Sequence, residues 1–199
     1  MKNSKMDAAR AYHEAGHAVA AWCLEIDIDC VTILPDGELA GQVKVKPEDP
    51  STYAAIERGE RWEPARFRAE KMVMCLQAGE VAQLRYNPRS VRPRQCERDR
   101  QCCIGLLRNY APDEKKTDVR PHYNLLVKWT VRLIDQHWHL VEAVAKALLD
   151  RRYLSDAQIL DVICSADEKL TRIKVQPLLD AVQIIRRRRE GLESGEDAQ

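Results

Sequence analysis

A helical pattern near the N-terminus, carrying two histidines four residues apart, constrains this chain more than any other feature. From Asp7 to about Leu24, apolar residues recur at the spacing of one helix face, and Asp7 is a suitable N-cap. The pentapeptide HEAGH occupies residues 13–17 of this stretch. Because residues i and i+4 of a helix are neighbours on one face, the segment predicts a helix that presents both imidazoles at one place.

The HExxH pattern supplies two zinc ligands and a general base within about one helical turn. His13 and His17 are the candidate ligands, and Glu14 is expected to point beside the metal. A zinc-bound water has a pKa of about 7, so a neighbouring carboxylate can take its proton and direct the hydroxide at a peptide carbonyl. Gly16 costs about 1 kcal/mol of helix propensity, which indicates close approach by another segment. The motif therefore predicts a zinc metalloendopeptidase with Glu14 as its catalytic residue.

Two histidines cannot close a tetrahedral zinc site, so a third ligand has to come from elsewhere in the chain. On the helix expected at about residues 94–110, Asp99 interrupts a stripe of otherwise apolar side chains. A carboxylate on such a face needs a partner or a metal, which makes Asp99 the candidate third ligand. His122 is the alternative, although an ordinary loop histidine is the simpler interpretation. Glu97 is expected on the solvated side of the helix.

The seven cysteines have no regular CxxC spacing, which argues against a secreted disulfide framework and against a structural zinc ribbon. We therefore expect a reducing, cytoplasmic compartment. Cys102 and Cys103 are interpreted as small core residues. Cys96 lies about one turn from Asp99, where its sulfur has a chance to approach the site.

The remaining pattern predicts a helix-rich chain with one small sheet. Hydrophobic residues make up 45% of the chain, which is enough for one core. The expected elements are a strand pair within 28–46, a short helix near 52–58, helices over 64–86 and 94–110, a long helix or broken pair over 121–150, and helical segments from about 155 and after Pro177. We expect residues 1–185 to form a zinc peptidase domain and residues 186–199 to be a disordered tail.

The charge balance and the hydropathy of the chain argue against a nucleic-acid partner and against a membrane segment. The 32 basic and 31 acidic residues balance to a net charge of +1, so no nucleic-acid partner is expected, despite the run Arg186 to Arg189. The sequence MKNSKMDAARAYHE at the N-terminus lacks the apolar run of a signal peptide, and no stretch of about 18 apolar residues occurs. These features predict a soluble protein with no membrane segment.

The flanks of HEAGH add a family resemblance. AYHEAGHAV at residues 11–19 resembles the zinc-binding helix of the FtsH-type zinc metallopeptidase family, and VTILPDGELAGQVKVKP at 31–47 resembles the strand pair behind it. LQAGEVAQL at 76–84 and LVEAVAKALLDRRYLSDAQI at 140–159 are similar to later helices, and CERD at 96–99 aligns Asp99 with the family's aspartate ligand. The resemblance implies a mainly α fold with a small β-sheet (α+β), bound zinc (Zn²⁺), and a peptide or unfolded protein as substrate.

The chain departs from that family in two respects. FtsH-type enzymes carry a membrane segment and an ATPase module, whereas this sequence has no GxxxxGK[ST] phosphate loop, so ATP-independent proteolysis by a stand-alone peptidase domain is expected. SVRPRQ at residues 90–95 replaces the glycine-containing segment that precedes the third ligand. A homo-oligomer and a separate ATPase or adaptor partner both stay open, and no oxyanion-stabilising residue is assigned.

A non-catalytic binding or scaffold protein with a structural zinc is the alternative function. A structural site is closed by a fourth protein ligand, whereas a catalytic site keeps one position open. The edge of the expected strand pair also has two interpretations: an extended substrate adds to it as another strand, or it only packs on the zinc helix. A nucleic-acid binder that uses the basic tail is a third interpretation.

Overall fold

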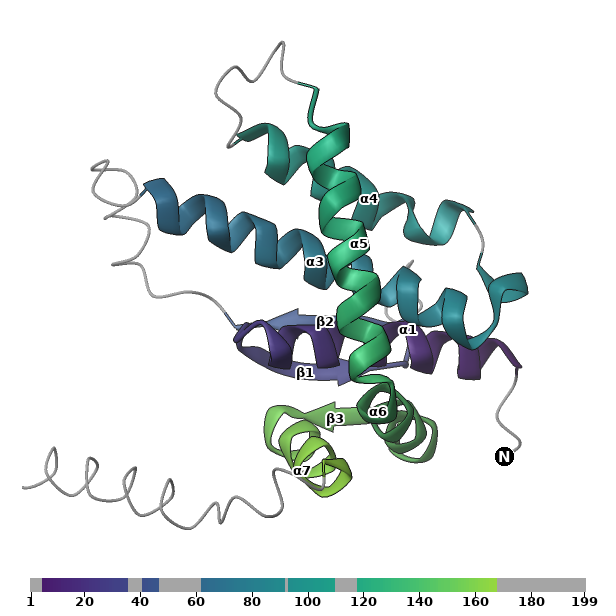
Figure 1. Cartoon of the computed structure of the whole chain (residues 1–199). Coiled ribbons are helices and arrows are strands. Elements are labelled where there is room, and N and C mark those ends of the chain that lie inside the picture. The colour runs from purple at the N-terminus through teal and green to yellow at the C-terminus, as the bar shows by residue number, and fades with distance from the viewer. Residues whose placement is uncertain (1–4, 36–40, 47–61, 92, 110–117, 168–199) are drawn as a thin grey trace, which may run out of the picture. The chain divides into compact units, whose positions relative to one another are not determined.

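The computed structural model describes residues 5–35, 41–46, 62–91, 93–109 and 118–167 (Figure 1). The chain divides into two compact units, Met1–Ile163 and Cys164–Gln199, and the first holds every element discussed below apart from the end of its last helix. Three expectations, the short helix near 52–58, the helical segment after Pro177 and the domain boundary at 185/186, lie outside the described residues. Among the described helices, none combines the length and the apolar character needed to cross a bilayer.

Helix α1 (Lys5–Cys23) is the expected zinc helix, and it packs against α3 (Trp62–Tyr86) and α6 (Trp138–Arg151). Its buried face is rich in alanine, which lets neighbouring helices come close. At Gly16, an added Cβ would lie 2.4 Å from the carbonyl oxygen of Ala78 and 2.6 Å from Cβ of Ala82. The prediction that Gly16 marks a close approach is confirmed, and the approaching segment is α3.

The sheet has three antiparallel strands in the order β2-β1-β3. The expected pair is present as β1 (Ile28–Thr32) and β2 (Gln42–Val45), with β2 at the edge. The sequence did not predict β3 (Tyr153–Ser155), because three residues are too few to establish an alternating pattern. Arg152, at φ 64°, ends α6 in the left-handed region and turns the chain into β3. The expectation of a mainly α fold with a small β-sheet is confirmed.

The remaining helices follow, and two of them enclose a core with α3. They are the 3₁₀ turn η1 (Pro88–Ser90), α4 (Pro93–Asn109), α5 (Arg120–Gln136) and α7 (Asp156–Ala166). In Figure 1, α5 crosses α3, with α4 on the other side of the crossing from α1. Val73, Cys103 and Leu126 are fully buried at this crossing. The stretch 121–150 is the broken pair of the two alternatives, since His137 separates α5 from α6.

Candidate metal centre

The structure brings the three predicted ligands together from two helices. His13 and His17 project from α1, Asp99 projects from α4, and one ligand atom of each lies within 4.8 Å of the others. The Nε2 atoms of the histidines are 3.1 Å apart, and Oδ2 of Asp99 is 3.7 Å from Nε2 of His13. Zinc–nitrogen bonds of 2.0–2.1 Å at a tetrahedral angle separate two ligand atoms by roughly 3.3 Å. The donor set and its spacing therefore fit a zinc ion.

Hydrogen bonds at the outer nitrogens turn both imidazoles toward this centre. Nδ1 of His17 lies 2.8 Å from the carbonyl oxygen of Cys75, and Nδ1 of His13 lies 3.0 Å from Oε1 of Gln83. Each oxygen accepts a hydrogen bond, so each Nδ1 carries a proton and each neutral Nε2 carries a lone pair. Two lone pairs and a carboxylate facing one another repel unless a cation lies among them. The arrangement thus calls for a positive charge at its centre.

The pKa values of the two histidines move in opposite directions. Burial lowers the pKa of His13, but its hydrogen bond to Asp99 and the charges of Glu14 and Asp99 bring the net pKa above the ordinary value. Burial lowers the pKa of His17, and the charge of His13 lowers it further. Without a metal, the pair therefore takes up one proton beyond those on the two Nδ1 atoms more readily than it takes up a second. Nitrogen ligands have to lose that proton to bind zinc.

Gly79 of α3 forms one wall of the centre. An added Cβ there would lie 2.3 Å from Nε2 of His17 and 2.8 Å from Nε2 of His13. A side chain at this position would thus collide with both ligand nitrogens. The backbone of α3 approaches the ligand atoms so closely that only glycine leaves them room.

Polar contacts between α3 and α4 hold Asp99 over the histidines. The neighbouring residue, Arg100, donates to both carboxylate oxygens of Glu80 on α3. One turn further along α4, Cys103 accepts a 3.3 Å hydrogen bond from Gln77, whose Oε1 accepts from the hydroxyl of Tyr123 at 2.8 Å. Bidentate pairing fixes orientation as well as distance. The face of α4 that carries Asp99 is therefore set toward α1.

Glu14 is buried beside the ligands. Only 6% of its surface is exposed, and an added Cβ at Gly41, just before β2, would lie 2.5 Å from its Oε1. Burial raises the pKa of Glu14 to about 7; the charges of His13 and Arg10 oppose this rise and that of Asp99 adds to it. A carboxyl group with a pKa near neutrality is suited to exchange protons with a substrate at physiological pH.

The other residues considered in the sequence lie elsewhere. His122, the alternative ligand, pairs with Glu70 at 3.0 Å and is not one of the three grouped ligands. Cys96 is fully buried and also stands outside the group. The core interpretation holds for Cys103 but is wrong for Cys102, which is exposed because adjacent helical residues point in different directions.

Several other charged residues and histidines also lie outside the group of three ligands. Glu97 is exposed, as predicted, and accepts a hydrogen bond from Gln101. His139 is exposed, and His137 lies between two helices and not within one. Arg85 pairs with Asp135, so its positive charge serves a contact within the protein.

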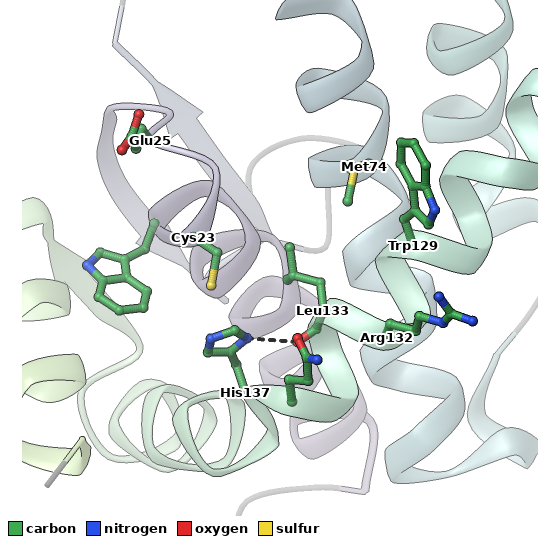
Figure 2. A pocket seen from close by; sticks show the side chains of 9 residues that line it. Cys23, Glu25, Met74, Trp129, Arg132, Leu133 and His137 are labelled. Atoms are coloured by element: carbon green, nitrogen blue, oxygen red, sulfur yellow. Dashed lines mark hydrogen bonds between the residues drawn. The ribbon is translucent and has the colours of Figure 1, made fainter. Parts of the chain in front are cut away.

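A separate hollow lies at the C-terminal end of α1 (Figure 2). Its volume is about 600 Å³, and its lining includes Trp22, Met74, Trp129 and His137. Trp129 is 46% exposed there, and the ring of His137 is turned back to the carbonyl oxygen of Leu133 at 2.9 Å. Neither Glu14 nor any of the three candidate ligands lines this hollow.

No protein-family model and no curated protein matches this chain. The functional interpretation therefore rests on the sequence motif and the geometry of the site. Gln83, Cys75 and Gly79 were not predicted as members of the site. Their roles depend on the approach of α3 to α1, and a sequence pattern within α3 carries no signal for that approach.

Proposed function

We propose that this chain is a zinc-dependent, ATP-independent peptidase that hydrolyses peptide bonds in peptides or unfolded proteins. The observation that carries the proposal is the group formed by His13, His17 and Asp99, in which His17 is buried and the other two are partly buried, with Glu14 on the same helix as two of the ligands. Three protein ligands of the types His, His and carboxylate are the set found at catalytic zinc sites, which keep one position open. We also propose that the chain belongs to the FtsH-type family.

In this mechanism, His13, His17 and Asp99 hold the ion. Bound zinc supplies Lewis-acid polarisation of the substrate carbonyl and of water. Glu14 accepts a proton from the attacking water as the new carbon–oxygen bond forms. It then gives that proton to the amide nitrogen as the carbon–nitrogen bond breaks, so that Glu14 regains its starting state. The products are a carboxylic acid and an amine, which ionise to a carboxylate and an ammonium group.

Strand β2 offers a place for the substrate backbone. It lies at the edge of the sheet, and Gly41 before it contacts the carboxylate of Glu14. An extended peptide that adds to this edge would run next to Glu14. This placement favours strand addition over the alternative that β2 only packs on α1. A separate ATPase or adaptor is the partner class that would deliver unfolded chains, and the cytoplasm is the compartment we propose.

The test is cleavage of an unfolded protein by the zinc-loaded chain without nucleotide. Glu14→Gln should lower kcat by about 10²–10⁴-fold, because the amide cannot accept the proton, while the bound zinc remains at one per chain. Glu97→Gln is the matched control, since Glu97 is exposed and should leave the rate unchanged. If wild type binds zinc but cleaves nothing, the structural-zinc scaffold becomes the better interpretation. If the Glu14→Gln variant cleaves as fast as wild type, Glu14 is not the base.

A further inference from the structure

A backbone carbonyl oxygen determines which atom of the Gln83 amide donates and which accepts a hydrogen bond. The side chain is buried on α3, and its Nε2 lies 3.1 Å from the carbonyl oxygen of Ser90. Since a carbonyl oxygen only accepts, the amide nitrogen has to face Ser90 and the amide oxygen has to face Nδ1 of His13, at 3.0 Å. His13 is therefore the donor in that bond. The proton sits on Nδ1, and the lone pair sits on Nε2.

The hydroxyl of Ser90 has its direction fixed in the same way. Its Oγ lies 2.7 Å from the carbonyl oxygen of Asn87 and so donates to it, which leaves the lone pairs of Oγ to accept from Gln83 at 3.3 Å. The side chain of Asn87 in turn accepts from the backbone nitrogen of Arg89. One directed series of hydrogen bonds thus runs from His13 through Gln83 to the η1 turn.

This series joins the segments that supply all three ligands. His13 shares α1 with His17, and Ser90 ends the η1 turn three residues before α4 begins at Pro93. Asp99 lies in the second turn of α4. A single buried amide therefore contacts one histidine ligand directly and also the segment that leads to the carboxylate ligand.

We propose that Gln83 is a positioning residue of the metal centre, which holds His13 in its Nδ1–H tautomer and ties it to the Ser90 turn ahead of α4. This inference rests on the proposed zinc site, because the tautomer matters only if Nε2 is a ligand. Partners of this kind orient a ligand before the metal arrives. Loss of the amide leaves the ring free to rotate and to exchange tautomers.

Two variants at buried polar side chains test the inference. Gln83→Leu removes the hydrogen bonds to His13 and to Ser90 and should weaken zinc binding by about 10–100-fold. Thr130→Val is the control, because Thr130 is fully buried on α5 and its hydroxyl donates to the carbonyl oxygen of Leu126 in its own helix, at 2.9 Å, rather than to a ligand. Gln83→Glu keeps an acceptor for His13 but loses the donor to Ser90, so it should keep the Nδ1–H tautomer and recover only part of the affinity. Gln83→Met replaces Gln83→Leu if the latter does not fold.

The experiment combines zinc affinity with the ¹⁵N chemical shifts of the His13 ring in the metal-free protein. The pH is raised until these shifts no longer change, because the pKa of His13 lies above its ordinary value and the ring has to be neutral. The expected result is an Nδ1–H tautomer in wild type, Thr130→Val and Gln83→Glu, and a mixture of tautomers with weakened zinc binding in Gln83→Leu. An unchanged tautomer or an unchanged affinity in Gln83→Leu would overturn the inference. If wild type bound no zinc, the proposed function would fail and the inference with it, whereas zinc binding that is insensitive to Gln83 would refute the inference alone.

Discussion

Replacing Gly79 by alanine should abolish tight zinc binding with little effect on folding. The new Cβ would lie 2.3 Å from Nε2 of His17, against an ordinary contact of 3.4–4 Å, so the ring or α3 has to move by at least about 1 Å. His17 cannot yield freely, because the carbonyl oxygen of Cys75 holds its Nδ1. Metal–ligand distances tolerate only about 0.2 Å, so we expect zinc affinity to fall by at least about 100-fold.

Two effects on the stability of the metal-free protein oppose each other. Alanine gains about 1 kcal/mol over glycine in a helix, and overpacking costs about 1–3 kcal/mol. The net change in the free energy of unfolding should therefore lie between about zero and a loss of 2 kcal/mol. Gly105→Ala on α4 is the control: nothing lies within 4 Å of its added Cβ, so it should gain up to about 1 kcal/mol and leave zinc affinity unchanged.

The assay is urea denaturation in the presence of a chelator, together with zinc titration against a chromophoric competitor. The reasoning predicts that the two glycine variants separate on zinc affinity and differ by no more than about 3 kcal/mol in stability. If Gly79→Ala bound zinc within about threefold of the wild-type affinity, the geometry of the site would be refuted. Even a tenfold change in affinity corresponds to only about 1.4 kcal/mol, so a threefold change would mean that the added Cβ hardly disturbs the ligands.

Three other predictions address the third ligand, the cysteines and the core. Asp99→Asn replaces an anionic ligand by a neutral amide, so zinc affinity should fall by more than the roughly 10–100-fold that loss of an outer partner costs, as measured by competitive titration. At pH 8, iodoacetamide should modify the exposed Cys102 well before the buried Cys75. Burial, with smaller effects from Cys103 and Asp99, raises the pKa of Cys75 to about 12 and keeps it as the unreactive thiol. Mass spectrometry of the digested protein gives the order of modification, and equal rates would contradict the prediction. Leu126→Ala should lower the free energy of unfolding by about 2–5 kcal/mol in urea denaturation, because Leu126 is fully buried at the crossing of α3 and α5; a loss below 1 kcal/mol would show that the core there is loosely packed.

The sequence alone predicted the parts of the site that depend on local periodicity. His13 and His17 share a face because they are four residues apart in a helix, and their helix was expected within two residues of its observed bounds, Lys5–Cys23. Asp99 was predicted because a carboxylate interrupts an otherwise apolar stripe, and the structure places it 3.7 Å from His13. Helical spacing and the cost of burying a charge are both properties of single segments.

Only the tertiary structure decided which atoms surround those ligands. Gly79 and Gln83 belong to α3, far from the HEAGH segment in sequence, and their contacts exist because Gly16 lets α3 approach α1. Strand β3 likewise forms only because the end of α6 reaches β1, where Leu154 pairs with Val31. Local pattern determines which face of a segment is apolar or carries chemistry, whereas the partner of that face is determined by packing among segments remote in sequence.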